Sequence, residues 1–157
     1  MQKISPCLWF DTEGEEAANF YTSVFKNSRI LDVSRYGEAG PRPAGTVMTV
    51  TFEIEGQEFT ALNGGPEFKF NEAVSFQVQC ETQEEVDELW STLTKEGEAG
   101  PCGWLKDRYG LSWQIIPTAL DELLNDPDPQ RSQRAMKAML QMGKLDIEAL
   151  RRAADQA

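Results

Sequence analysis

Residues 11–25 read DTEGEEAANFYTSVF, and residues 81–93 read ETQEEVDELWSTL. After one deleted residue the two stretches correspond: in each, a Thr is followed three residues later by a Glu, which is the spacing of a helix capping box. An apolar stripe at helical spacing then follows, and a strand-like segment precedes each stretch, at residues 4–10 and 75–80. This repetition predicts two related supersecondary units that pack as a pair.

Strand patterns surround both predicted helices. After the first helix, segments of strand-like composition and alternation predict strands at 29–36, 46–54 and 57–63. The second half is shorter, with room for strands around 102–107 and 111–116 and a doubtful third. We therefore predict an α+β fold of paired βαβββ modules, of which the second is short of a strand.

The predicted organisation is a single domain over residues 1–157. Its two modules occupy about 1–70 and 71–117, and a helical extension follows over 118–157. An Asp-Pro-Asp-Pro run at 126–129 predicts a break between the helices of this extension.

The longest helix of the extension carries an apolar stripe. The stripe indicates packing in the core or in a homodimer, and the alternative is a groove that binds a partner protein. Its members are Ala135, Met136, Met139 and Leu140.

Composition excludes several classes of function. The formal net charge of -11 disfavours nucleic-acid binding and acidic membrane surfaces, because both depend on clustered Lys and Arg. No apolar run approaches the length of a membrane span, and the first residues do not resemble a secretory signal, so we expect a cytoplasmic protein. The three cysteines are far apart and indicate reduced thiols rather than a disulfide framework.

The chain contains no histidine. This absence removes Ser-His and Cys-His nucleophilic sites, imidazole acid-base catalysis and every His-ligated metal centre. Any chemistry must use other groups.

Four segments resemble a known family. They read LWFDTEGEEAANFYTSVFKNS, LNGGPEF, CETQEEVDELW and CGWLKDRYGLSWQIIP. They are similar to the PhnB-like family, often labelled 3-demethylubiquinone-9 3-methyltransferase, within the vicinal oxygen chelate superfamily of glyoxalase, bleomycin-resistance and dioxygenase proteins. The resemblance implies paired βαβββ modules whose sheets curve around a cavity, usually in a dimer.

In metal-using relatives each module supplies ligands, commonly His and Glu, from its first and last strands. The resemblance places Gln114 at the Glu position, Ser5 and Ser75 at or beside the first-strand positions, and Asn63 near the end of the fourth strand. These side chains are neutral hydrogen-bonding groups and are poor ligands for a divalent metal. We therefore expect a metal-free site without a cofactor.

Alternation along the predicted strands also favours a polar cavity. Ser75, Gln77 and Gln79 share one strand face, and Ser112 shares a face with Gln114. A solvent-facing sheet would give the same pattern; the resemblance is what turns this face inward. Further candidates for the cavity are Trp9 and Trp104 as flat walls and Lys106 as an anchor for an anion, with core packing or an exposed Lys as the alternatives.

Two other residues of the last hairpin have alternative interpretations. Cys102 is a nucleophile if Lys106 lowers its pKa, and otherwise an inert thiol. Asp107 and Gly110 are expected to form the hairpin turn, with Asp107 accepting from turn amides.

Three functions remain open from the sequence. The first is a protein that binds a small, partly apolar metabolite in a metal-free polar cavity. The second is a metal-independent enzyme acting on such a metabolite, although the adenosyl-cofactor fold that the methyltransferase label implies is not visible. The third is a protein-interaction module with a vestigial cavity.

Overall fold

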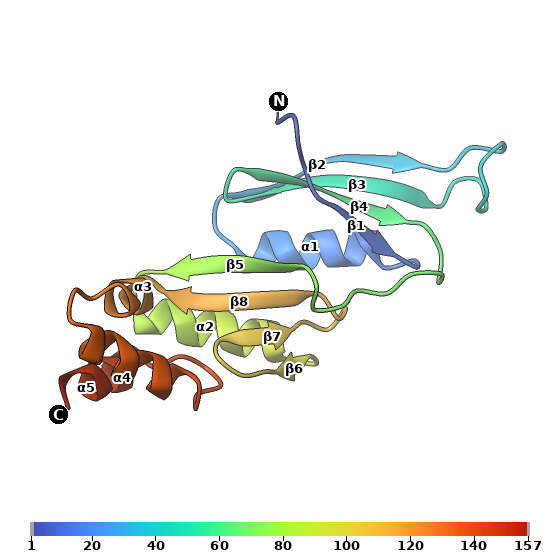
Figure 1. The fold of residues 1–157 in the computed structure, drawn as a ribbon. Coiled ribbons are helices and arrows are strands. Elements are labelled where there is room, and N and C mark those ends of the chain that lie inside the picture. Colours follow the sequence, from blue (N-terminus) through green and yellow to red (C-terminus); the bar gives the residue numbers. More distant parts are fainter. Residues whose placement is uncertain (1, 157) are drawn as a thin grey trace. The chain divides into compact units, whose positions relative to one another are not determined.

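The computed structural model describes residues 2–156, so the two ends of the predicted domain, residues 1 and 157, lie outside the described residues. Each half of the chain begins with a strand and a helix and continues with further strands, as the repeat predicts (Figure 1). In chain order the elements are β1 (Cys7–Phe10), α1 (Gly14–Val24), β2 (Ser28–Arg35), β3 (Val47–Ile54), β4 (Gln57–Asn63), β5 (Ser75–Cys80), α2 (Gln83–Thr94), β6 (Glu98–Ala99), β7 (Trp104–Lys106), β8 (Ser112–Pro117), α3 (Thr118–Leu124), α4 (Pro129–Met139) and α5 (Ile147–Asp155).

The chain divides into two compact units, Met1–Lys69 and Phe70–Ala157. The first unit contains one sheet with the strand order β1-β4-β3-β2, in which β1 is parallel to β4 and the other pairs are antiparallel. Helix α1 covers one face of this sheet, where the ring of Tyr21 stacks on that of Phe52 at 6.2 Å. Both rings are fully buried, so the aromatic contact forms the centre of the first core.

The second unit repeats this connectivity. Its sheet has the order β5-β8-β7-β6, with β5 parallel to β8 and α2 packed on one face. Val86 and Leu93 of α2 are fully buried, and so is Ile115 of β8. The paired βαβββ modules and the α+β class are therefore confirmed.

The second sheet differs from prediction in having its fourth strand. Strand β6 has only two residues, Glu98 and Ala99, which pair with Lys106 and Leu105. Two residues are too few to show alternation, so the sequence pattern missed the strand. The glycines that flank it allow this close pairing: a Cβ on Gly97 would lie 2.2 Å from the carbonyl oxygen of Lys106.

The two central helices begin differently, although their sequences share the Thr-x-x-Glu spacing. The hydroxyl of Thr82 accepts a hydrogen bond from the amide of Glu85 at 3.1 Å, so the predicted cap of α2 is confirmed. The predicted cap at Thr12 is wrong. The N-cap residue of α1 is Glu13, and the amide of Gly14 donates instead to the side chain of Asn63, 49 residues away, at 2.7 Å.

The C-terminal helices form a core of their own with the end of β8. Leu145, Leu150 and Ala154 are fully buried there, and Met139 packs against them. The predicted break between the helices at residues 126–129 is confirmed: α3 ends at Leu124, and Asp128 caps α4 by accepting a hydrogen bond from the amide of Gln130. None of the helices within residues 2–156 is long and apolar enough to cross a bilayer.

The apolar stripe of α4 divides into two parts. Ala135 is fully buried, whereas Met136 and Leu140 are 40% and 56% exposed. The homodimer expected from this stripe stays a prediction.

Candidate ligand-binding site

Strands β5, β7 and β8 place six side chains on the sheet face opposite α2. Residues directly opposite one another on paired strands project to the same face, and here Ser75 pairs with Ser112 and Gln77 with Gln114. On the other side of β8, Lys106 and Trp104 pair with these same two residues. We call this surface the polar face; it consists of Ser75, Gln77, Trp104, Lys106, Ser112 and Gln114.

Three residues of the polar face form a hydrogen-bonded row. The Nε2 of Gln114 donates to the Oγ of Ser75 at 2.9 Å, and the Nε2 of Gln77 donates to the Oε1 of Gln114 at 3.4 Å. The structure thus brings together three of the residues that the sequence predicted for a cavity. Gln77 is exposed at the end of the row, so its amide remains accessible to a ligand.

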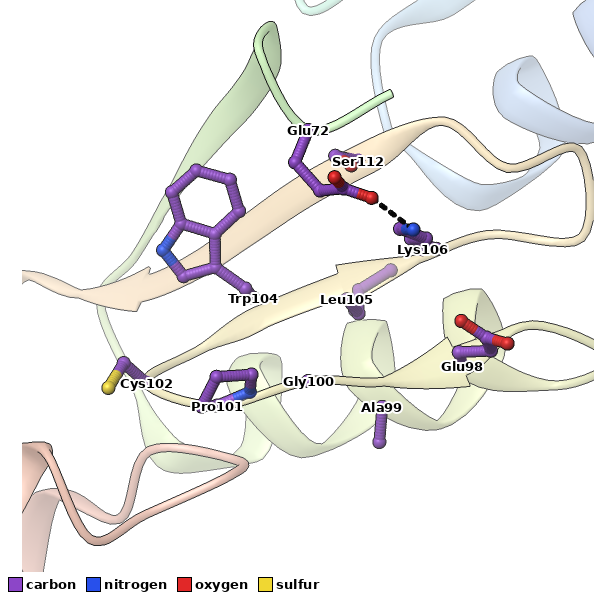
Figure 2. Close-up of a pocket in the computed structure, with 10 residues that line it drawn as sticks. All are labelled: Glu72, Glu98, Ala99, Gly100, Pro101, Cys102, Trp104, Leu105, Lys106 and Ser112. Carbon is purple, nitrogen blue, oxygen red and sulfur yellow. Dashed lines mark ion pairs between the residues drawn. The ribbon is translucent and has the colours of Figure 1, made fainter. Parts of the chain in front are cut away.

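A pocket of about 340 Å³ lies at the β7 side of the polar face (Figure 2). The predicted residues Trp104 and Lys106 line it, and Figure 2 shows the Trp104 ring standing as a flat wall. Its volume lies at the lower end of the range of small-molecule sites. The other lining residues are Glu72, Glu98, Ala99, Gly100, Pro101, Cys102, Leu105 and Ser112.

Lys106 forms an ion pair with Glu72, which precedes β5 (Figure 2). The hydrogen bond between them raises the pKa of Lys106 and lowers the pKa of Glu72, so both groups are held in their charged forms. The side chains are 37% and 60% exposed, and exposed pairs of this kind are weak because water screens them. Sequence reasoning missed Glu72, because nothing in its local pattern distinguishes it from other surface carboxylates.

Ser112 is the buried member of the polar face. Its side chain lines the pocket, its exposed fraction is 0%, and its Oγ has no hydrogen-bond partner among residues 2–156. Most buried hydroxyls in proteins are partnered, because burial without a hydrogen bond costs free energy. Alternation predicted the strand face on which Ser112 lies, but no sequence signal could show that its hydroxyl is buried and lacks a hydrogen-bond partner.

Asp107 fixes the hairpin that holds β7 and β8 in place. Its carboxylate is buried and accepts from the amides of Tyr109 and Leu111 at 2.8 and 3.1 Å, and from the Nε1 of Trp113 at 2.9 Å. Gly110 has a φ of 86°, which favours glycine. The predicted turn role of both residues is confirmed.

Cys102 lies at the opposite end of β7 from Lys106, as Figure 2 shows. Cys102 lies in the turn before β7, with a φ of 57°, whereas Lys106 is the last residue of β7. Lys106 pairs instead with Glu72, so the structure gives no support to the hypothesis that Lys106 activates this thiol.

Two predicted residues belong to the first unit. Ser5 is exposed and precedes β1, whereas Trp9 lies within β1 on the face opposite α1. The Trp9 ring is already packed: its Nε1 donates to the carbonyl oxygen of Gly65 at 2.8 Å, and Phe68 contacts it edge-on at 4.9 Å. Gly64 allows this arrangement, because a Cβ there would lie 2.4 Å from the ring.

Asn63 occupies a different place from the one expected. Its side chain is buried on the α1 side of the first sheet, where it accepts from Gly14 and donates to the carbonyl oxygen of Val47 at 3.2 Å. The registers of the two parallel strand pairs show which residues of β4 and β8 occupy equivalent positions. Asn63 pairs with Phe10 at the ends of β4 and β1. Thr60, which pairs with Cys7, occupies the position in β4 that is equivalent to Gln114 in β8. Asn63 lies three residues beyond Thr60, and an odd separation along a strand places the two side chains on opposite faces of the sheet.

The metal centre of the wider superfamily does not fit these residues. The groups on the polar face that correspond to ligand positions are the hydroxyl of Ser75 and the amide of Gln114, which hydrogen-bond each other. Neutral groups of this kind do not hold a divalent ion without carboxylate or imidazole ligands. Within residues 2–156, no group of three His, Cys, Asp or Glu side chains is placed to hold a metal ion.

An adenosyl cofactor does not fit the described residues either. Such cofactors bind at the Gly-rich first turn of a doubly wound parallel sheet, and both sheets here have one parallel pair each. The Gly64-Gly65 pair, the nearest equivalent to a Gly-rich turn, accommodates the Trp9 ring.

Comparison with known proteins now adds to this geometry. The family model described as 3-demethylubiquinone-9 3-methyltransferase matches residues 2–116. The chain belongs to this family. A PhnB protein from Bacillus cereus that carries the same description is 41% identical, with a TM-score of 0.66, and the match covers 74% of this chain and 99% of that one. The expected membership of the PhnB-like family is therefore confirmed.

Two further solved structures share the fold alone. Protein PA1353 from Pseudomonas aeruginosa is 18% identical with a TM-score of 0.62, over 74% of this chain and 98% of that one. The fosfomycin resistance protein FosX from Listeria monocytogenes is 14% identical with a TM-score of 0.51, over 74% and 93%. No curated protein matches the chain.

Proposed function

We propose that the protein binds a small, partly apolar metabolite at the polar face of the second sheet, without a metal ion. The observation that carries this proposal is the pocket of about 340 Å³ between the Trp104 wall and the charged end of β7. One side offers the aromatic surface of Trp104, and the other offers the ammonium group of Lys106 and the hydroxyl of Ser112. This combination suits a ligand with an apolar body and at least one oxygen acceptor.

The hydrogen-bonded row of Ser75, Gln77 and Gln114 supports the same proposal. A glutamine amide has two donors and an acceptor, and the bonds of Gln114 use only part of this capacity. The parallel pairing of β5 with β8 places the three side chains next to one another on the same face. Polar groups placed in this way orient a ligand and provide specificity.

A thermal-shift screen of chelator-treated protein tests the proposal. Small aromatic and aliphatic metabolites are added one at a time, and a ligand of the folded state raises the melting temperature by mass action. Trp104→Ala and Gln114→Ala are expected to abolish the shift caused by any hit. Thr60→Ala, at the position of β4 that matches Gln114, serves as the matched control and is expected to retain it. A shift that survives both polar-face variants, or appears only after metal is added, contradicts the proposal.

A further inference from the structure

The strongest unexplained feature of the pocket is the hydroxyl of Ser112. Its Oγ is fully buried and has no hydrogen-bond partner among the described residues. A serine of this kind costs free energy in the folded protein unless a group from outside supplies the missing bond. Its neighbour across the strand pair is Lys106, whose ammonium group extends from the same face.

The Lys106 ammonium already holds an anion. Figure 2 shows the Glu72 carboxylate meeting the Lys106 ammonium in the part of the pocket where Ser112 lies. Glu72 comes from the segment before β5, outside any helix or strand, and its side chain is 60% exposed. An exposed carboxylate on such a segment is held weakly and can be exchanged for another.

We propose that Lys106 and Ser112 form a carboxylate subsite, in which the Lys106 ammonium pairs with Glu72 in the free protein and with the carboxylate of a ligand after binding. This inference rests on the proposed function and adds the chemical class of the ligand: a small carboxylic acid with an apolar body. In the bound state one carboxylate oxygen pairs with the Lys106 ammonium, and the other accepts from the Ser112 hydroxyl. The apolar body lies against Trp104.

A carboxylate explains the groups present better than a neutral ligand does. Lys106 supplies a full positive charge, and its pKa is raised by Glu72 first and also by the charge of Glu98, so it remains protonated. A neutral ligand that displaced Glu72 would remove the carboxylate paired with this ammonium and supply no charge in its place. The Ser112 hydroxyl can donate to an anion at no cost of breaking an existing bond.

Titration with a matched pair of probes tests the inference. Benzoate and benzamide have nearly the same shape, and only benzoate is charged. Each is added to 15N-labelled, chelator-treated protein at millimolar concentrations, and the amide shifts of residues 104–106 and 112–114 are followed. We expect benzoate to bind at least about tenfold more tightly than benzamide, because it gains charge-assisted hydrogen bonds to Lys106 and Ser112.

Three variants assign the effect to named groups. Glu72→Gln is expected to tighten benzoate binding by about threefold or more, because the competing charge is gone. Lys106→Gln is expected to remove the preference for benzoate over benzamide. Glu88→Gln makes the same charge change as Glu72→Gln at an exposed position of α2, and is expected to leave both affinities unchanged.

Ser112→Ala separates a ligand role from a structural one. The Ser112 hydroxyl has no partner in the part of the chain that the structure describes, so its removal is expected to leave the melting temperature unchanged or raise it, while benzoate binding weakens several-fold. A fall in melting temperature with unchanged benzoate binding would overturn the role of Ser112. Equal binding of benzoate and benzamide at Trp104 would overturn the carboxylate subsite and leave the proposed function intact. Binding of neither probe, together with no hit in the thermal-shift screen, would overturn both.

Discussion

The last strands of the two sheets, β4 and β8, occupy the same place in the two units and are used differently. In the first unit the end of β4 is structural, because the Asn63 side chain holds the first amide of α1. In the second unit the matching strand end is Pro117, and α2 is capped by its own Thr82. Because α2 is capped by its own Thr82, no β8 side chain is needed at the helix start, and Ser112 and Gln114 of β8 lie on the polar face, opposite α2. The comparison teaches that one topology can support either a helix start or a ligand surface at the same strand.

The hairpin that holds β8 provides the most severe test of this comparison. Asp107→Ala leaves two turn amides and the Trp113 Nε1 without their buried acceptor, so we expect the free energy of unfolding to fall by about 3–5 kcal/mol. Glu55→Ala, in the exposed β3–β4 turn of the first unit, is expected to change it by less than about 0.5 kcal/mol. Urea unfolding measures both. Equal effects would show that the two hairpins do not differ as described.

Alkaline pH is expected to lower the stability of the protein through the buried thiol of Cys80 in the second unit. Burial, and then the carboxylate of Glu85, raise the pKa of the Cys80 thiol to about 12 from an ordinary value of 9.0. The folded state thus favours the protonated thiol, so the stability contribution is complete below pH 9 and is lost as pH rises from 9 to 12. The expected slope approaches 1.4 kcal/mol per pH unit at most, by linkage.

Lysines titrate in the same pH range and also change the stability there. The contribution of Cys80 is therefore obtained by comparing the pH profiles of variants with that of the wild type. Cys80→Val is expected to remove most of the Cys80-dependent decline in unfolding free energy above pH 9, whereas Cys7→Ala in the first unit is expected to keep it. Identical pH profiles for wild type and Cys80→Val would contradict the assignment.

Loss of the hydrogen bond between Asn63 and the first amide of α1 is expected to have a smaller effect on stability. Asn63→Ala removes the acceptor of the Gly14 amide and the donor to Val47, so we expect a loss of about 1–2 kcal/mol in unfolding free energy. Thr60→Ala, on the opposite face of the same strand, is the control and is expected to cost less. Hydrogen exchange at the first turn of α1 should accelerate in Asn63→Ala alone. Unchanged exchange would contradict the role of Asn63.

The smallest contrast lies in the two Thr-x-x-Glu motifs. Thr82→Ala removes a helix cap and is expected to cost about 1 kcal/mol. Thr12→Ala removes no cap and is expected to stay within about 0.5 kcal/mol of wild type. Chemical denaturation of the two variants side by side would show this difference, and equal losses would contradict it.

The sequence predicted the fold well because the fold depends on local periodicity. The strand alternation and the helical stripes marked seven strands and both central helices, and the relation between residues 11–25 and 81–93 marked the repeat. Strand β6 escaped because two residues carry no period. The Thr12 cap failed because a distant side chain, Asn63, competes for the same amide, and no local pattern shows such a competitor.

The candidate site was predicted only in part, for a related physical reason. Alternation placed Ser75 with Gln77 on one strand and Ser112 with Gln114 on another, and the register shows that these two strand faces lie side by side. The ion pair of Glu72 with Lys106 and the burial of the unpaired Ser112 hydroxyl depend on which segments of the folded chain meet. Such contacts follow from tertiary structure, so neither composition nor spacing could identify them.

The central claim is that the polar face of the second sheet is a metal-independent ligand site. The most direct measurement is a 15N–1H correlation spectrum of chelator-treated protein with and without a hit from the thermal-shift screen. The claim predicts that the largest shift changes fall on residues 104–106 and 112–114. Changes confined to β1 and β4, with those residues unaffected, would contradict it, as would binding that returns only when a divalent metal is restored.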